Sequence, residues 1–519
     1  MPASVLGYAA QVGAGGLVAM NGKTAIAKTV LACALWCGAA FVGWAQTVSS
    51  NTESIASAIR AKNYDRALEL ARQALKTAPN DVQVLTLEGL ALKELGQEQK
   101  SLAAFQRALQ LSPDYLAALE GAAQLEYAAG SDGAIPLLDR LLKLRPNEPT
   151  AHAMRAVMAW KRRDCETAVL NFEQSRSVIA SQPDALKEFG ICLVRLKHTE
   201  GAAEVFRQLV AQDPTNRQAR YSLASVEIMA QRYQAALDSV QPLIAGVNPD
   251  PEALALAASA YEAMGDTPRA VSTLRQAIVV APRNESYYLD FAALSFAHKS
   301  YEAGIQMIGA GLKVSPESPK LHLARGILYV QVGQIDQADA DFAASERLDP
   351  EQPSTAAARV LTHLQQNHME EALKAVREEM AGRPNDGFLY YLLAEVLNWQ
   401  GPPAGTPEFQ KALDAALTAV RLQPGLALAR NLLSRLYLDA GQVTLAMEQC
   451  RVVLRDNPQD PVALYRLMRA LKNTGDAEDA KQIPELLRKF NEARQIVSKQ
   501  EAQENRYKLV DEASSGAAK

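Results

Sequence analysis

Aromatic residues and cysteines are scarce in this sequence. Aromatic side chains make up 6% of its 519 residues, and the five cysteines form no C-x-x-C pair. The sequence also contains no H-E-x-x-H and no G-x-S-x-G motif, and it has six histidines. Familiar metal-dependent and nucleophilic hydrolases are recognised by such motifs. The sequence therefore predicts no catalytic residues, no metal ligands and no cofactor, and we expect that the protein is not an enzyme.

A strong net charge of either sign is also missing. The chain has 54 lysines and arginines against 58 acidic residues, which gives a formal net charge of -4. Proteins that bind nucleic acid usually carry a basic excess or a basic patch, so we expect no nucleic-acid partner. Hydrophobic residues make up 48% of the chain and charged residues 22%, which is typical of a folded protein. Alanine and leucine dominate, and this composition favours helices over strands.

One long uncharged apolar run lies near the N-terminus. It covers residues 29–45, follows two lysines and precedes a polar stretch. A basic segment, an apolar core and a small exit residue are typical of a secretory signal. We expect residues 1–45 to be a signal peptide, with Met20 as an alternative start, and residues 46–51 to be a short linker. The expected location is exported, either periplasmic or at the cell surface. The length of the run also leaves an uncleaved inner-membrane anchor open.

Three cysteines remain beyond the predicted signal peptide, namely Cys165, Cys192 and Cys450. Their odd number and wide spacing predict no disulfide framework. One pair could still form, and the sequence does not say which two cysteines it would join.

Proline recurs along the chain with a regular period. Most gaps between the marker prolines are 34 residues or twice that length. A fixed period in a helical sequence indicates a repeat architecture, in which each unit buries its apolar face against its neighbours. The marker prolines stand at positions 79, 113, 146, 214, 282, 316, 350, 384, 424 and 458.

Between these prolines the same residue types return in the same register. In residues 82–113 a first apolar helical pattern contains Gly89, a turn follows at Gly96, and a second helical pattern contains Phe105. The pattern resembles the tetratricopeptide repeat family, in which a large residue, Leu-Gly, Tyr, Ala, Phe, Ala and Pro follow at fixed offsets. The resemblance implies an all-α fold, an α-α superhelix (solenoid) of about thirteen helical hairpins over residues 52–490.

Two units depart from this pattern. The first unit, which ends at Pro79, is expected to be shortened. The eighth carries three glycines, Gly304, Gly309 and Gly311, in one predicted helix. Glycine in a helix interior is destabilising, so these residues either allow close packing or mark a point where the solenoid flexes.

Two further stretches of the sequence do not follow the repeat, one within it and one after its last unit. Four of the residues from Gly401 to Gly405 are proline or glycine, yet the repeat resumes in phase six residues late. We interpret this stretch as an insertion in the turn of the eleventh hairpin, with Thr406 capping the next helix. Residues 491–519 are expected to form a charged C-terminal capping helix and a disordered tail.

In the tetratricopeptide repeat family, the first helices of the hairpins line a concave groove that holds a partner. Carrying those positions over predicts a partner-binding groove in this chain. The lysine and asparagine clamp of the chaperone-binding members is absent, because Ile191 stands where asparagine would be needed. The predicted groove residues are Tyr221, Phe296, Ile327, Tyr391, Trp399, Asn431, Arg435 and Arg469.

Two function classes follow from the resemblance. The first is an exported protein–protein interaction scaffold that binds partner proteins or an extended segment, in envelope or polysaccharide-export assembly. The alternative is a non-catalytic accessory subunit of an enzyme complex, such as a glycosyltransferase or a protease. Both imply a protein or peptide partner, and membrane contact only through an uncleaved N-terminal segment. The oligomeric state stays open.

Overall fold

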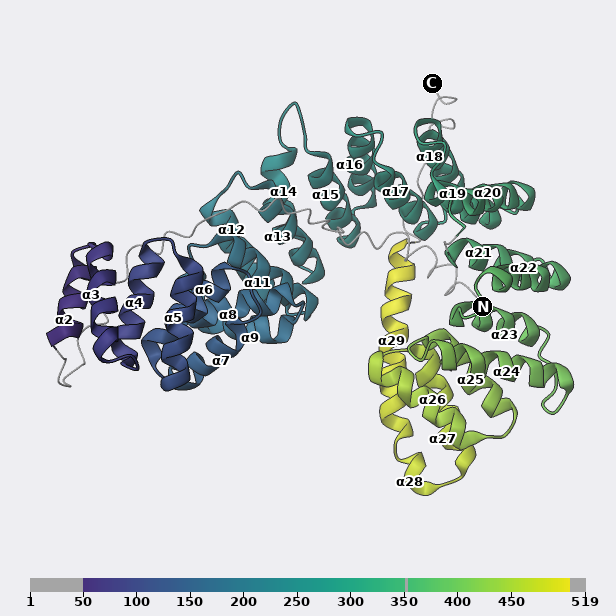
Figure 1. Cartoon of the computed structure of the whole chain (residues 1–519). Helices are drawn as coiled ribbons and strands as arrows, with labels where there is room; N and C mark the ends of the chain where they lie inside the picture. Colours follow the sequence, from purple (N-terminus) through teal and green to yellow (C-terminus); the bar gives the residue numbers. More distant parts are fainter. Residues whose placement is uncertain (1–49, 351–352, 505–519) are drawn as a thin grey trace. The chain divides into compact units, whose positions relative to one another are not determined.

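The computed structural model describes residues 50–350 and 353–504. The regular elements of these residues are helices, which follow one another as antiparallel pairs (Figure 1). None of the described helices is long and apolar enough to cross a membrane. The predicted signal peptide and the predicted tail beyond residue 504 lie outside the described residues.

The chain divides between residues 243 and 244 into two compact units. The described part of the N-terminal unit contains six hairpins, each made of a first and a second helix. Their helices are α2 Ser50–Arg60 and α3 Tyr64–Thr77, α4 Val82–Glu94 and α5 Glu98–Leu111, α6 Leu116–Ala128 and α7 Ala134–Leu144, α8 Pro149–Lys161 and α9 Cys165–Gln174 with the short α10 Arg176–Ile179, α11 Pro183–Arg195 and α12 Thr199–Gln212, and α13 Arg217–Met229 and α14 Tyr233–Ile244.

The described part of the C-terminal unit contains the other seven hairpins. Thirteen hairpins in all confirm the predicted repeat number. The helices of this unit are α15 Pro251–Ala263 and α16 Thr267–Val280, α17 Glu285–Ala297 and α18 Tyr301–Val314, α19 Pro319–Gln331 and α20 Ile335–Leu348, α21 Pro353–Gln365 and α22 Met369–Gly382, α23 Gly387–Asn398 and α24 Pro407–Leu422, α25 Ala427–Asp439 and α26 Val443–Asp456, and α27 Pro461–Thr474 with α28 Ala477–Ala480 and α29 Ile483–Glu504.

The repeat glycines and phenylalanines pack directly on one another. A Cβ built on Gly89 would lie 2.7 Å from the ring of Phe105, and one built on Gly121 of the next hairpin would lie 2.4 Å from the same ring. Such distances are far below van der Waals contact, so a side chain at either position would push the helices apart. The ring of Phe105 is buried. It therefore joins its own hairpin to the next one.

Every hairpin has a residue with a positive φ at the same repeat position of its turn, and the longer turn of the eleventh hairpin adds a second one, Gly405. Seven of the residues at this repeat position are glycines, including the predicted Gly96 and Gly401. The other six are Lys62, Arg163, Lys197, Gln231, Lys299 and Asn367, with φ between 52° and 62°. The helix pair thus imposes the left-handed conformation even where the sequence does not offer glycine.

The second helix of the first hairpin is not shortened, whereas its first helix, α2, begins at the edge of the described residues and has 11 residues against 13 in α4. Helix α3 has 14 residues, the same length as α5. In the eighth hairpin, a Cβ on Gly304 would lie 2.8 Å from Leu328 Cδ1 and one on Gly311 would lie 2.9 Å from Tyr288 Cγ. These two glycines allow close packing, while flexing of this hairpin stays a prediction.

The insertion before α24 follows the predicted course. Helix α23 ends at Asn398, Gly401 has a φ of 63°, and α24 starts at Pro407. The hydroxyl of Thr406 accepts a hydrogen bond from the amide of Phe409 at 3.3 Å, so Thr406 is the N-cap. Helix α24 has 16 residues, two more than α26, so the inserted residues lengthen both the turn and the helix.

The described residues end in a long helix, α29, that packs against α27. The ring centroids of Phe490 and Tyr465 lie 6.1 Å apart. The expected boundary between residues 490 and 491 falls inside α29.

Two of the three cysteines pair. A disulfide joins Cys165 at the start of α9 to Cys192 in α11, with the two Cα atoms 5.0 Å apart. It therefore links the fourth hairpin to the fifth. Cys450 is a free, buried thiol, and burial raises its pKa.

Candidate partner-binding site

The first helices of the C-terminal unit form one continuous series. Helices α17, α19, α21, α23, α25 and α27 each contact the next first helix (Figure 1). Side chains at the same repeat position of consecutive hairpins therefore lie beside one another. This arrangement lets residues that are 34 or more positions apart in sequence contribute to one surface.

The predicted residues Arg435 and Arg469 meet on this series of helices. Arg435 Nε lies 3.7 Å from Asp439 Oδ2, and Arg469 Nη2 lies 3.9 Å from Asp439 Oδ1. The side chains of Arg435 and Arg469 are 44% and 49% exposed. One carboxylate therefore faces two exposed guanidinium groups on adjacent helices.

Aromatic and basic side chains flank this group. Trp399, at the C-terminal end of α23, is 37% exposed and Tyr465 is 54% exposed. Tyr465, Arg469 and Lys472 are three or four residues apart on α27, which places them on one face of the helix. We name the following set the C-terminal first-helix face: Trp399, Arg435, Asp439, Tyr465, Arg469 and Lys472.

A buried polar network lies beneath the C-terminal first-helix face. The hydroxyl of Tyr391 donates a hydrogen bond to Glu395 Oε1 at 3.1 Å. Burial raises the pKa of the Glu395 carboxyl, and the positive charges of Arg435 and Arg466 oppose that rise. Burial also raises the pKa of Tyr391. The predicted residue Tyr391 is thus buried and holds a carboxylate in place.

The same network continues through Arg466 and Asn431. The guanidinium of Arg466 donates a hydrogen bond to the carbonyl of Asn431 in the preceding first helix. The amide of Asn431 donates to Asp460 Oδ1 at 3.4 Å, and Asp460 caps α27 by accepting from the amide of Ala463 at 2.7 Å. These bonds fix α25 against α27. The exposed arginines of the C-terminal first-helix face therefore stand on a rigid base.

The remaining predicted groove residues lie elsewhere. Tyr221 is buried in α13 of the N-terminal unit. Ile327 is buried in α19 beside Phe342, and Phe296 is half-buried in α17 with its ring centroid 5.8 Å from that of Tyr301. Of the eight predicted residues, Trp399, Arg435 and Arg469 are exposed. Partner binding by all eight stays a prediction.

Five residues of this region were not among the predicted eight, namely Glu395, Asp439, Tyr465, Arg466 and Lys472. Asp439 follows Arg435 by four residues, a spacing from which their pairing could have been predicted. Arg466 carries no such signal, because its sequence does not distinguish it from the exposed Arg469. Only the packing of α27 on α25 turns one arginine inward and leaves the other outside.

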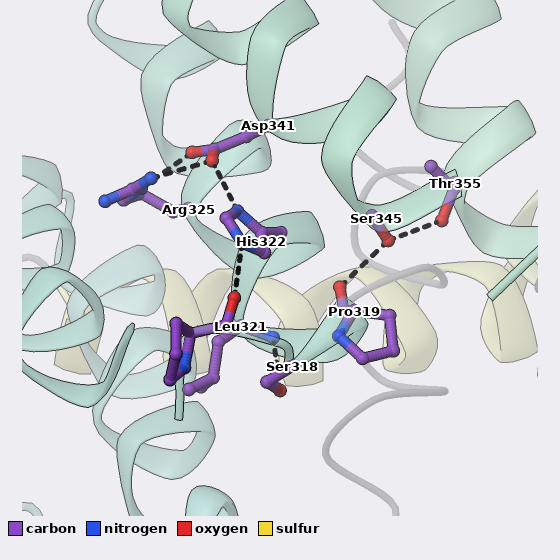
Figure 2. Close-up of polar contacts among 9 residues, drawn as sticks. Ser318, Pro319, Leu321, His322, Arg325, Asp341, Ser345 and Thr355 are labelled. Atoms are coloured by element: carbon purple, nitrogen blue, oxygen red, sulfur yellow. Dashed lines mark hydrogen bonds and ion pairs between the residues drawn. The ribbon is translucent and has the colours of Figure 1, made fainter. Parts of the chain in front are cut away.

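Polar side chains also secure the loops between hairpins (Figure 2). His322 Nδ1 lies 2.8 Å from Asp341 Oδ1, and its Nε2 lies 3.2 Å from the carbonyl oxygen of Pro316. Arg325 pairs with both oxygens of Asp341 at 2.7 and 2.8 Å. His322 therefore ties the marker proline, the first helix and the second helix of its hairpin together.

The same hydrogen-bonding arrangement recurs at equivalent repeat positions. His152 contacts Asn171 Oδ1 and the carbonyl oxygen of Pro146, each at 2.8 Å. In three other hairpins the residue six positions after the marker proline donates to that proline's carbonyl, and these residues are Arg220, Tyr288 and Arg430. The contacts of His152 and His322 thus serve the repeat itself. Among the described residues, no group of three or more histidine, cysteine, aspartate or glutamate side chains is arranged to hold a metal ion.

Comparisons with known proteins agree with this architecture. Family models described as tetratricopeptide repeat match residues 56–115, 189–251, 253–286 and 408–461. Anaphase-promoting complex subunit 7 of Mus musculus is 23% identical over 204 residues, which cover 32% of this chain and 36% of that protein. The protein of the same name from Homo sapiens is 37% identical over 70 residues, which cover 14% of this chain and 12% of that protein. The matched regions thus span little more than a third of these curated relatives at most.

Solved structures give similar matches. Yeast Tom70 aligns with a TM-score of 0.41 and 16% identity, over 87% of this chain and 94% of that chain. A tetratricopeptide repeat protein from Parabacteroides merdae aligns with a TM-score of 0.28 and 17% identity, over 46% of this chain and 94% of that chain. The family models match four segments, and helical hairpins of the same kind follow one another before, between and after these segments in the described residues. The chain is a tetratricopeptide repeat protein, with family-model matches over these four segments.

Proposed function

We propose that this protein is an exported scaffold that holds a partner protein against the C-terminal first-helix face. The observation that supports this proposal most is the exposure of aromatic and arginine side chains on three consecutive first helices, with Trp399 at the end of α23, Arg435 in α25, and Tyr465 and Arg469 in α27. Tryptophan, tyrosine and arginine are the residues that contribute most often to binding energy at protein interfaces. The buried network beneath them joins α25 to α27, so the two helices that carry the arginines need no rearrangement when a partner binds.

The disulfide supports export. Disulfides form and persist in oxidising compartments and are rare where thiols are kept reduced. The Cys165–Cys192 bond lies between two hairpins in the N-terminal unit. Together with the predicted signal peptide over residues 1–45, it supports a periplasmic or cell-surface location. We place the scaffold in the assembly of an envelope or polysaccharide-export machine, because exported proteins of this family resemble such assembly factors.

A second candidate function is an accessory subunit of an enzyme complex. The two curated relatives are named as subunits of a complex, and this resemblance favours a subunit role. In that case deleting the protein would abolish an enzymatic activity, such as glycosyl transfer or proteolysis, that the purified chain lacks. A scaffold for assembly would instead leave the activity of each separate component intact.

Site-specific photo-crosslinking in native cells tests the scaffold proposal. A photoreactive amino acid replaces Lys472 on the C-terminal first-helix face, and in a matched control it replaces the exposed Lys411 on the second helix α24. We expect one defined protein to be captured from position 472 and not from position 411. Equal capture from both positions, or none from position 472, would contradict the proposal.

The location is tested separately. N-terminal sequencing of the protein from native cells should give a chain that begins after residue 45. Alkylation before and after reduction should show that Cys165 and Cys192 are oxidised while Cys450 is not. An unprocessed N-terminus in the membrane fraction would support the anchor instead, and reduced Cys165 and Cys192 would contradict export.

A further inference from the structure

The C-terminal first-helix face has a charge that differs from the rest of the chain. Helices α23, α25 and α27 carry five basic residues and two acidic ones, whereas the whole chain has a net charge of -4. Helix α27 contains no acidic residue at all. A local positive surface attracts negatively charged partners. The basic residues are Arg430, Arg435, Arg466, Arg469 and Lys472, and the acidic ones are Glu395 and Asp439.

The two exposed arginines also have unused hydrogen-bonding capacity. Their nitrogens approach the Asp439 carboxylate at 3.7 and 3.9 Å, which is longer than a hydrogen bond. Neither guanidinium donates a hydrogen bond to an acceptor in the part of the chain that the structure describes. A guanidinium group presents five N–H donors in a planar fork that matches a carboxylate. One aspartate therefore satisfies only part of the charge and few of the donors.

Nearby acidic groups do little to offset this charge. The carboxyl of Glu395 is half-buried and already accepts a hydrogen bond from the hydroxyl of Tyr391. Arg466 is turned toward the Asn431 carbonyl and anchors the helix pair. The charge that reaches the surface thus comes from Arg435, Arg469 and Lys472.

We infer that the C-terminal first-helix face binds an acidic, extended segment of a partner protein, whose carboxylates are held by Arg435 and Arg469. The inference rests on the proposed scaffold function and adds the chemistry of the partner. Trp399 and Tyr465 would contact apolar side chains that flank the acidic residues, since Tyr465 is exposed on the same helix face as Arg469 and Trp399 is exposed at the end of α23. Because the arginines stand on adjacent helices, the segment would cross α25 and α27.

Binding of matched peptides to the full chain tests this inference. The probes are short fluorescent peptides with aspartate and glutamate between apolar residues, and the same peptides with asparagine and glutamine instead. We expect the acidic peptides to bind and the amide versions to bind at least about tenfold more weakly, because a hydrogen bond to a charged group contributes that much. Arg435→Gln and Arg469→Gln should each weaken binding of the acidic peptide about tenfold. Raising the salt concentration should also weaken binding of this peptide to the wild type.

Two exposed arginines on second helices supply the charge-matched control. Arg421→Gln in α24 and Arg451→Gln in α26 remove the same charge away from the C-terminal first-helix face. These variants should bind the acidic peptide as the wild type does. If they weaken binding as much as Arg435→Gln and Arg469→Gln, the attraction is non-specific and the inference is wrong.

Two further outcomes separate this inference from the scaffold proposal. Equal binding of acidic and amide peptides, lost on Trp399→Ala, would overturn the acidic preference and leave the scaffold standing. Arginine-dependent binding of polygalacturonate oligomers without binding of the acidic peptides would show that the face takes an anionic polysaccharide instead, which also overturns the inference. Capture of a protein through position 472 tests the scaffold independently of both results.

Discussion

The ring of Phe342 occupies the space that a side chain on Gly326 would need. A Cβ built on Gly326 would lie 2.5 Å from Phe342 Cε1, and the phenylalanine is fully buried. Gly326 is in the first helix of the ninth hairpin and Phe342 is in the second. The absence of a side chain on one helix and the ring on the other thus set the distance between the two helices.

Changing either residue should destabilise the ninth hairpin. Phe342→Ala should cost about 3–5 kcal/mol, because it removes a buried ring and leaves a cavity. Gly326→Ala should cost about 1–3 kcal/mol, because the methyl group overlaps the ring. Urea unfolding measures both losses, and hydrogen exchange on α19 and α20 shows whether they are local.

The double variant tests the coupling between these positions. In a Phe342→Ala background the space is empty, so Gly326→Ala should cost far less than in the wild type. Equal costs in both backgrounds would show that Gly326 is required for another reason.

The disulfide should contribute measurably to stability. Breaking Cys165–Cys192, which closes a loop of 27 residues, should lower the free energy of unfolding by about 2–4 kcal/mol. Thermal unfolding with and without reductant measures the effect. The Cys165→Ala/Cys192→Ala double variant should unfold at the temperature of the reduced protein and should not respond to reductant. A response in that variant would assign the effect to another site.

Replacing a non-glycine turn residue with glycine should stabilise the protein. Lys197 has a φ of 61°, a conformation that costs an L-residue roughly 1–2 kcal/mol. Lys197→Gly should therefore increase the free energy of unfolding by about 0.5–1 kcal/mol, once the conformational entropy that glycine loses on folding is subtracted. The unfolding temperature should rise accordingly. Gly333→Ala, at φ 74° with no atom near its Cβ, should lower stability instead. The opposite signs would show that backbone conformation, not packing, is responsible.

The ion pair in Figure 2 should matter more than the histidine contact beside it. Asp341→Asn keeps a partner for His322, as Asn171 does for His152, but removes the charge that pairs with Arg325. We expect a loss of about 1–3 kcal/mol, and a larger loss for Asp341→Ala, which removes both partners. Hydrogen exchange of α19 and α20 measures these losses. Equal effects of the two variants would contradict this assignment.

Stability should fall with rising pH because of Glu188. Burial raises the pKa of this carboxyl from its ordinary value of 4.5 to about 7. The folded state therefore binds a proton between pH 4.5 and 7 that the unfolded state releases. The free energy of unfolding should decrease across this window, by up to ~2 kcal/mol, and level off above it.

Glu188→Gln is the matched variant for this pH effect. It should remove the decrease and make the protein more stable than the wild type at about pH 8. Chemical unfolding at several pH values provides the measurement. An unchanged pH profile in Glu188→Gln would show that another group titrates in this window.

Much of the fold could be predicted because repeat signals are local. The spacing of prolines gave the hairpin number, Gly401 and Thr406 gave the course of the insertion, and Gly89 with Phe105 gave the helix crossing. Each of these residues acts within one hairpin or on its immediate neighbour, so a period of 34 residues carries the information. The positive φ of Lys197 could not be predicted from the presence of glycine, because packing of the two helices overrides the preference of lysine for a negative φ.

Tertiary packing decided the rest. The sequence by itself determined a repeat array whose first helices alternate apolar and polar positions. It could not determine that Tyr391 and Asn431 would be covered while Arg435 and Arg469 stay exposed, because the neighbouring helix decides which side of a repeat position meets solvent. It also could not assign the cysteine pair. Two cysteines can bond only where the fold brings their Cα atoms within about 7 Å. Helices α9 and α11 place those of Cys165 and Cys192 5.0 Å apart.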